Sequence, residues 1–276
     1  MRKETHATSM RRPRFDLLAL DIDGTLLDDD FAIPPRHREA VRAAQEAGVQ
    51  IALVSGRALP AVRPYYADLG IEGLAVSCNG ARVTRVPQGD DLFHRPLEQS
   101  HAETIIGECE VRGLHLNVYV GDHLYAREYT PWARLYHERT GSRCEEHADL
   151  VALAAAGPTK LLIVTDPDTG TRLADEFRAR FDGELYVTLT MPEYVEFMHR
   201  EVSKADGLAK TAQALGIDRS RVAAAGDSYS DISMIRWAGL GIAMANGVDP
   251  CRAAADVVAP SNSENGLAWA IEQYVL

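Results

Sequence analysis

The chain has 276 residues, of which 46% are hydrophobic and 25% charged, and it carries a formal net charge of −11. These proportions are ordinary for a globular protein, and the length favours two domains over a single core. The acidic balance argues against nucleic acid as a partner, although a bound metal and a few local donors would still allow an anionic substrate.

The cysteine pattern and the hydropathy indicate a cytoplasmic protein without membrane contacts. Four cysteines are scattered without a C-x-x-C pair, which favours free thiols over a disulfide framework or a zinc site. No uncharged apolar stretch approaches the roughly 20 residues that cross a bilayer. Residues 1–14 are polar and basic, unlike a secretory signal, so we expect a disordered N-terminal extension in which Met10 is an alternative start.

The first part of the chain alternates between strand and helix. Apolar runs, together with helix boundary signals such as Pro34 and Gly48, define the elements. In chain order they are a strand at 15–20, a helix at 34–47, a strand at 49–54, a helix at 60–69 and a strand at 74–77. Apolar strands separated by helices are typical of a parallel sheet covered on both faces.

From about residue 86 the pattern changes to a mixture of helices and hairpins. Ser100-x-x-Glu103 predicts a capping box that opens a helix ending near Gly113. The elements that follow are a hairpin of strands at 114–120 and 123–127, helices at 132–140 and 149–155, a strand at 160–165, a turn at 166–170, a helix at 171–181 and strands at 185–189 and 194–199.

The alternating pattern then returns and completes the predicted fold. The elements are a helix at 203–215, a strand at 221–225, a helix at 232–238, strands at 241–244 and 257–258, and a helix at 267–274. The chain is therefore predicted to be α/β, with a Rossmann-like, doubly wound parallel sheet core formed by residues 15–85 and 200–276. Residues 86–199 form an inserted α+β domain.

Two carboxylates, Asp21 and Asp23, stand at the end of the first predicted strand and are followed by a Gly-Thr turn. An unpaired buried carboxylate costs several kcal/mol, so two of them at one strand end indicate a cation, most simply Mg²⁺ bound through oxygen. A lone D-x-D also occurs in ordinary turns and helix caps. The position of the glycine excludes an EF-hand loop.

Other predicted strands also end in polar residues. Ser55-Gly-Arg57 follows the second strand, and Gly226-Asp227-Ser-Tyr-Ser-Asp231 follows the strand at 221–225. Each has an ordinary alternative as a helix cap or a first-turn acid. Because ligands bind at the carboxyl ends of strands in a doubly wound sheet, their joint occurrence favours a site.

Lys204 is one of only four lysines and lies in the first turn of a predicted helix, behind a Ser203-x-x-Asp206 capping box. A cation there opposes the helix dipole by about 0.3–1 kcal/mol. Either the side chain extends into solvent, or the ammonium and the helix N-terminus together attract a bound phosphate.

In this order the motifs resemble those of the haloacid dehalogenase (HAD) superfamily: D-x-D-x-T, then Ser or Thr, then Lys, then an acidic pair. The matching segments are Asp21-Ile-Asp23-Gly-Thr25, Ser55-Gly-Arg57, Lys204 and Gly226-Asp227-Ser-Tyr-Ser-Asp231. The place of the insertion is similar to the type IIB cap of the Cof-like branch, as are residues 77–81 and 241–246. Ala205 and Ser230 depart from the usual Gly and Asn, which bears on metal affinity and substrate preference.

The resemblance implies a Mg²⁺-dependent phosphatase that hydrolyses a small phosphate ester through an aspartyl phosphate. Asp21 would be the nucleophile and Asp23 the general acid and base. The implied metal ligands are Asp21, Asp23, Asp227 and Asp231. The implied phosphate-binding residues are Thr25, Ser55, Gly56 and Lys204. Further candidates for supporting the site are Arg57, Asn79 and Ser228.

Several alternatives stay open at this point. A phosphomutase or phosphotransferase would use the same nucleophile but keep water out. A signalling receiver domain also combines Asp, Ser or Thr, Lys and Mg²⁺, but its acidic pair precedes the phosphorylated Asp. A phosphosugar-binding protein without catalysis is a third alternative. The resemblance favours sugar phosphates over nucleotides, flavin mononucleotide or pyridoxal phosphate, and the oligomeric state is open.

Overall fold

The computed structural model describes residues 13–276, which form two compact units. Of the described residues, the first unit contains 13–52 together with Ala212–Leu276, and the second is Leu53–Thr211. The predicted extension at 1–14, including Met10, lies outside the described residues except for Pro13 and Arg14. The predicted insertion at 86–199 falls within the second unit.

The first unit is built on a five-stranded sheet with the order β14-β13-β12-β1-β2. The strands are β1 (Leu17–Leu20), β2 (Gln50–Leu53), β12 (Val222–Gly226), β13 (Leu240–Met244) and β14 (Val257–Ala259). β1 runs parallel to β12, β12 to β13, and β13 to β14. Every residue of β1 and β12 is buried, as expected for strands covered on both faces.

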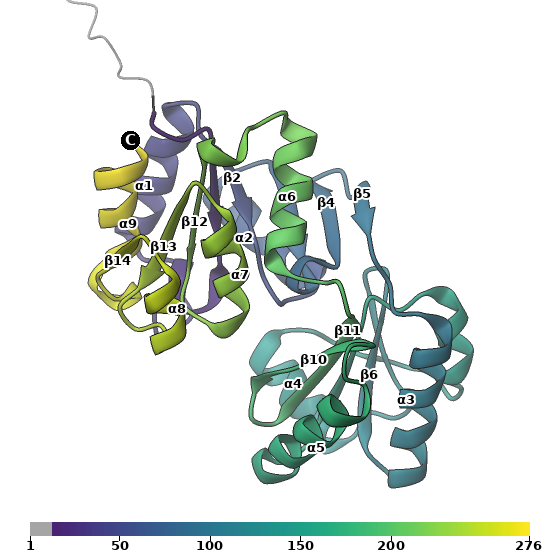
Figure 1. Cartoon of the computed structure of the whole chain (residues 1–276). Coiled ribbons are helices and arrows are strands. Elements are labelled where there is room, and N and C mark those ends of the chain that lie inside the picture. The colour runs from purple at the N-terminus through teal and green to yellow at the C-terminus, as the bar shows by residue number, and fades with distance from the viewer. Residues whose placement is uncertain (1–12) are drawn as a thin grey trace, which may run out of the picture. The chain divides into compact units, whose positions relative to one another are not determined.

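Short helices cover this sheet. They are α1 (Pro35–Glu46), α7 (Ile232–Trp237), α8 (Asp249–Ala254) and α9 (Gly266–Ala270). α1 packs against α9, whereas α7 packs against β12 and β13. Figure 1 shows α1 and α9 on one side of the strands and α7 on the other. This arrangement confirms the predicted α/β class with a doubly wound sheet.

The second unit contains a small antiparallel sheet in the order β3-β4-β5. Its strands are β3 (Gly73–Ser77), β4 (Arg82–Val86) and β5 (Asp91–His94), and the unit also holds α2 (Leu59–Leu69) and the first part of α6 (Lys204–Leu215). Neither β4 nor β5 was predicted from the sequence. β4 carries a buried arginine, Arg82, whose charge is matched by Asp91 at 2.8 Å and Asp122 at 2.6 Å, so its polarity hides the strand pattern.

A six-stranded sheet with the order β10-β11-β9-β6-β7-β8 forms the rest of the second unit. Its strands are β6 (His115–Val120), β7 (His123–Ala126), β8 (Glu145–Glu146), β9 (Lys160–Val164), β10 (Leu185–Met191) and β11 (Tyr194–His199). Its helices are α3 (Gln99–Arg112), α4 (Pro131–Thr140) and α5 (Pro167–Arg180).

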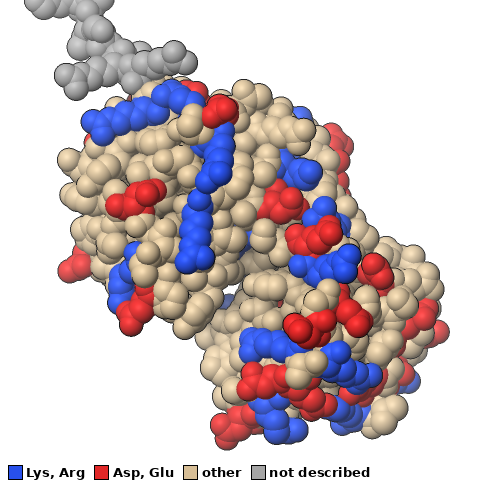
Figure 2. All heavy atoms as spheres, viewed as in Figure 1, with Lys and Arg blue, Asp and Glu red and all other residues tan. Residues whose placement is uncertain are grey.

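Side-chain alternation along β9 explains how both faces of this sheet are covered. Leu161 and Ile163 join a core with α3 and α5, whereas Leu162 and Val164 join a core with α4. On the outer surface, Arg112 and Arg180 of α3 and α5 bind Glu108, and Figure 2 shows the two signs of charge interspersed on this part of the second unit. The result is the α+β pattern predicted for the insertion.

Local details differ from the sequence analysis at helix ends. α3 begins at Gln99 with Glu98 in the cap position, so the predicted Ser100 capping box is wrong. The predicted turn at 166–170 is instead the start of α5, because the Asp166 side chain caps it by accepting from Thr169 N at 3.0 Å. α8 was not predicted at all. None of the helices within residues 13–276 has the length and apolar character that a membrane crossing requires.

Candidate active site

The first candidate residue, Asp21, directly follows β1 in the first unit. β1 is paired with β12 in register, with Leu20 opposite Ala225, and Asp21 N donates to the carbonyl of Ala225 at 3.0 Å. The Asp21 side chain is 4% exposed. The parallel ladder therefore holds a carboxylate at the buried end of a central strand.

A tight turn carries the chain from Asp21 past Asp23. Leu26 N donates to Asp21 O at 3.3 Å, which closes a five-residue turn, and Asp23 is half-buried within it. Gly24 has a φ of +79°, and a Cβ there would lie 2.5 Å from Asp227 Oδ2. Only glycine fits both the backbone conformation and the space. The turn is therefore shaped around the Asp227 carboxylate.

Asp227 directly follows β12 and is held from several sides. Its Oδ1 accepts a hydrogen bond from Thr25 Oγ1 at 3.2 Å, and its carbonyl accepts from Val248 N at 2.9 Å. A Cβ on Gly247 would lie 2.7 Å from that carbonyl oxygen. Thr25 was predicted to bind phosphate, and in the structure its hydroxyl contacts Asp227.

Asp231 is fully buried and folds back over the strand end. Its Oδ2 accepts from Asp227 N at 3.1 Å, from Ser228 N at 2.8 Å and from Ser228 Oγ at 2.6 Å. Three donors therefore fix the position of this one carboxylate oxygen. Ser230, which departs from the family pattern, lies 2.9 Å from Ser228 through their hydroxyl oxygens. A Cβ on Gly226 would lie 2.4 Å from Asp231 Cβ, so the packing here is tight.

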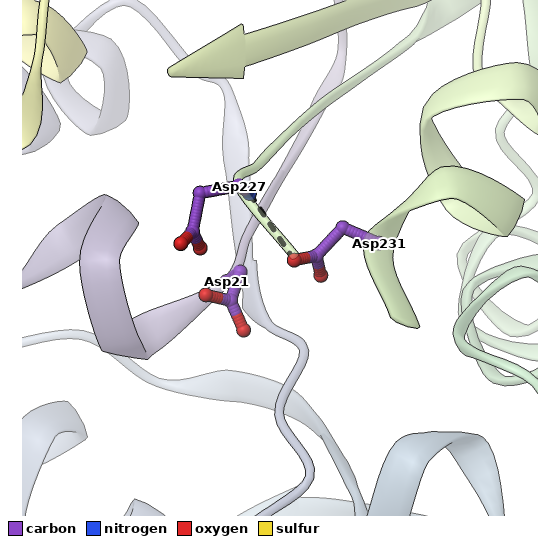
Figure 3. Close-up of side chains that lie close together, drawn as sticks. All are labelled: Asp21, Asp227 and Asp231. Carbon is purple, nitrogen blue, oxygen red and sulfur yellow. Dashed lines mark hydrogen bonds between the residues drawn. The ribbon is translucent and has the colours of Figure 1, made fainter. Parts of the chain in front are cut away.

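These elements bring three carboxylates together, as Figure 3 shows. One oxygen from each of Asp21, Asp227 and Asp231 lies within 4.8 Å of the others. Like charges this close repel one another, and a bound cation would offset that repulsion. Carboxylate oxygens are the ligands that Mg²⁺ prefers in proteins, so the donor set fits this ion.

Two asparagines that were not predicted as site residues support the turn that follows Asp21. Asn246 Nδ2 donates to Gly24 O at 2.9 Å, and Asn262 Nδ2 donates to Leu27 O at 2.9 Å. Asn262 N also donates to Asn246 Oδ1 at 2.9 Å. The S-N-S-E cap that holds Asn262, beginning at Ser261, is the signal that would have drawn attention to it.

A second group of candidate residues lies together in the second unit. Ser55 follows β2 by two residues, is 1% exposed, and accepts from Asn79 N through its carbonyl at 3.0 Å. Gly56 lies under the Asn79 side chain, since a Cβ there would be 3.1 Å from Asn79 Oδ1. Arg57 is half-buried and donates to Tyr65 OH at 3.0 Å.

Asn79 has a φ of +54° and is 2% exposed. Among the hydrogen bonds of the described residues, neither its Oδ1 nor its Nδ2 has a partner. A buried amide without partners is costly, and such a group is a candidate for contact with a ligand.

Lys204 begins α6 beside this turn and is 2% exposed. Ser203 caps the helix, because its Oγ accepts from Asp206 N at 3.1 Å. A Cβ on Gly80 would lie 2.0 Å from Ser203 O, so the turn after β3 and the N-terminus of α6 pack backbone to backbone. The structure thus groups Asp21, Asp23, Thr25, Asp227, Ser228 and Asp231 in the first unit, and Ser55, Gly56, Arg57, Asn79 and Lys204 in the second.

Comparison with known proteins finds similarity along almost the whole chain. The sequence model of the haloacid dehalogenase-like hydrolases matches residues 18–271. A Bacillus subtilis protein, the 5-amino-6-(5-phospho-D-ribitylamino)uracil phosphatase YcsE, is 30% identical over 260 residues, covering 94% of this chain and 96% of its own length.

Solved structures have the same fold. A haloacid dehalogenase-like hydrolase from Bacteroides thetaiotaomicron has a TM-score of 0.86 at 28% identity, covering 94% of this chain and 99% of that one. A subclass IIB sugar phosphatase of this superfamily has a TM-score of 0.82 at 19% identity, covering 94% and 98%. The latter confirms the fold predicted from the resemblance, a Rossmann-like core with an inserted cap. The chain belongs to the haloacid dehalogenase-like hydrolase family.

Proposed function

We propose that the protein is a Mg²⁺-dependent phosphatase that hydrolyses a small phosphorylated metabolite through an aspartyl phosphate on Asp21. The convergence of the Asp21, Asp227 and Asp231 carboxylates at the ends of two parallel strands carries this proposal. A bound Mg²⁺ would be held by these residues and by the carbonyl oxygen of Asp23. It supplies positive charge that screens the repulsion between an anionic nucleophile and an anionic phosphate.

The reaction uses two carboxyl groups that are two residues apart. A carboxylate oxygen of Asp21 attacks phosphorus, the bond from phosphorus to the leaving oxygen breaks, and Asp23 gives its proton to that oxygen. Water then attacks the phosphorus of the aspartyl phosphate, Asp23 takes a proton from this water, and the Asp21 carboxylate is released together with phosphate. Asp23 therefore returns to its protonated state after each turnover.

The residues of the second group are proposed to hold the phosphoryl oxygens, together with Thr25. The hydroxyl of Ser55, the backbone at Gly56 and the ammonium of Lys204 would act as donors, with Arg57, Asn79 and Ser228 in support. The buried amide of Asn79 and the position of Lys204 at the N-terminus of α6 support this assignment.

We propose sugar phosphates as the substrate class and the insertion at 86–199 as the cap that reads the leaving group. The relative YcsE acts on a phosphorylated ribityl chain, and this compound is chemically close to a sugar phosphate. We also propose a cytoplasmic location, which is supported by four buried free cysteines.

The test is phosphate release from a panel of pentose and hexose phosphates, a ribityl phosphate, nucleotides, flavin mononucleotide and pyridoxal phosphate. Each is assayed with Mg²⁺ and with EDTA. We expect release that depends on Mg²⁺ and is fastest for a few related sugar or polyol phosphates. Phosphate transfer between hydroxyls without release would instead show a mutase. Release that is unchanged in EDTA would contradict the proposed metal.

A further inference from the structure

Lys160, the first residue of β9, is a buried lysine in a chain that has only four. Its side chain is 2% exposed, and its Nζ donates to Glu196 Oε1 at 2.8 Å. Burial is the largest influence and would lower the pKa of Lys160, but Glu196, Tyr136 and Cys78 together outweigh it and hold the pKa above its ordinary value. The ammonium therefore stays charged, 4.9 Å from the centre of the Tyr119 ring.

A buried ion pair of this kind is a poor source of stability. Removing two charges from water costs about as much as their attraction returns, and apolar side chains of similar volume often serve as well. The pair also has a third partner, because Lys160 Nζ donates to the carbonyl oxygen of Gly56 at 3.1 Å, 104 residues away in the chain. The contact with Gly56 points to a role beyond stability.

The Gly56 carbonyl shares a planar peptide group with the N–H of Arg57. This N–H donates to Ser55 Oγ at 3.1 Å. Fixing the carbonyl therefore also fixes the direction from which Ser55 Oγ receives a hydrogen bond. A hydroxyl that accepts this bond keeps its own proton for another acceptor.

We propose that Lys160 is a positioning residue for phosphate binding. By holding the Gly56 carbonyl, Lys160 orients the Gly56–Arg57 peptide and so directs the Ser55 hydroxyl, while Glu196 keeps the ammonium in place. This rests on the proposed function, in which Ser55 donates to a phosphoryl oxygen. Lys160 itself does not touch the substrate.

A double-mutant cycle of Lys160→Met and Ser55→Ala tests the route through Ser55. The readouts are KM for the best substrate of the panel and Ki for inorganic phosphate. We expect each single variant to raise both constants about five- to tenfold, as for the loss of one hydrogen bond. The double variant should be no worse than Ser55→Ala, because the two act on one contact. Effects that multiply would overturn the proposal.

A second pair of variants separates positioning from stability. Lys160→Met leaves Glu196 buried without its cation, so Tm should fall, whereas Lys160→Met with Glu196→Met removes both charges and should regain most of the loss. We expect KM to stay raised in this second variant. If KM returns to its wild-type value together with Tm, the role of Lys160 is only structural. The control is Arg82→Met, which removes another buried cation of the same unit and should lower Tm at constant KM.

Hydrogen–deuterium exchange of residues 54–58 gives a readout without substrate. The Arg57 amide should exchange faster in both Lys160 variants than in the wild type or in Arg82→Met. Glu196→Gln removes the charge but keeps an oxygen that can accept from Lys160 Nζ and hold it at Gly56, so it should lose stability yet retain wild-type exchange at Arg57. A wild-type enzyme that releases no phosphate would refute the proposed function alone. Unchanged exchange in Lys160→Met would refute the positioning role.

Discussion

The five-stranded sheet of the first unit and the six-stranded sheet of the second are both buried on two faces, but they hold charged groups in opposite ways. Past the ends of β1 and β12, three like charges gather with oxygens within 4.8 Å of one another. Inside the six-stranded sheet, Lys160 and Glu196 match each other.

Strand direction accounts for this difference. Parallel strands end at a common edge, so acids that follow different strands converge there. In an antiparallel sheet, a side chain lies beside the opposite and the diagonal residues of the adjacent strand. Lys160 of β9 thus contacts Glu196 of β11, whose direct partner on β9 is Leu162. The comparison suggests that a cluster of carboxylates indicates a cation-binding site, whereas a buried ion pair such as Lys160–Glu196 can orient a neighbouring group.

The largest expected effect comes from Asp21→Asn, which removes one of the three neighbouring carboxylates. Because it removes the nucleophile, we expect kcat to fall by about 10⁴-fold or more. Because it also removes one metal ligand, Mg²⁺ should raise Tm less than in the wild type. Phosphate release and thermal melts with and without Mg²⁺ measure the two effects.

The matched control for this variant is Asp175→Asn on α5, where the aspartate side chain is 73% exposed and pairs with Arg178. It should change neither turnover nor the response to Mg²⁺. Clear residual turnover in Asp21→Asn would contradict the covalent mechanism.

A smaller effect is expected from Gly226→Ala, which tests how much the close packing at the end of β12 contributes to the position of Asp231. The new Cβ would meet Asp231 Cβ at 2.4 Å, so the buried carboxylate must move. We expect a loss of about 1–3 kcal/mol in the free energy of unfolding, together with a higher Mg²⁺ requirement. Urea unfolding and Mg²⁺ titration of activity measure these changes.

Gly107→Ala on α3 is the glycine control, since a Cβ at this position would have no neighbour within 4 Å. A helical glycine in open space costs backbone entropy, so this variant should gain about 0.5–1 kcal/mol in stability. If Gly226→Ala were as stable as the wild type, the close packing around Asp231 would not contribute to the free energy of unfolding.

Sequence patterns predicted the features that depend on neighbours in the chain. Apolar runs predicted the strands of both sheets except β8, whose two residues are charged. Acids placed just after such runs, such as Asp21 and Asp227, indicated a site from the order of residues alone. The comparisons confirmed the family predicted in this way, and the structure confirmed the fold class. The roles of the individual site residues stay predictions.

What could not be predicted depends on contacts between distant segments. Asn262 supports Leu27 across 235 residues, and Lys160 reaches Gly56 across 104. β4 was missed because the partners that neutralise Arg82 come from other strands and turns. A local pattern carries no record of such partners, so a buried polar residue in the sequence is indistinguishable from an exposed one.

The smallest expected effect concerns pH and a buried histidine in the first unit. His37 is fully buried, its Nδ1 lies 2.9 Å from Leu26 O at the end of the Asp21 turn, and its Nε2 has no partner among the described residues. Burial lowers the pKa of His37, against the opposing effects of the Leu26 carbonyl and of Asp28. Protonation would place a charged, unsatisfied N–H inside the core.

The direction of the pH dependence follows from the two states. Below about pH 6.5 the unfolded chain binds a proton at His37, whereas the folded chain does not. The free energy of unfolding therefore falls as pH falls, by at most about 1.4 kcal/mol per pH unit. Above that pH both states are neutral at this position and the term vanishes. Urea unfolding at pH 7.5 and 5.5 should therefore show a smaller acid-induced loss in His37→Gln than in the wild type, by about 1 kcal/mol. An equal loss in both proteins would mean that His37 binds a proton in the folded state as readily as in the unfolded state.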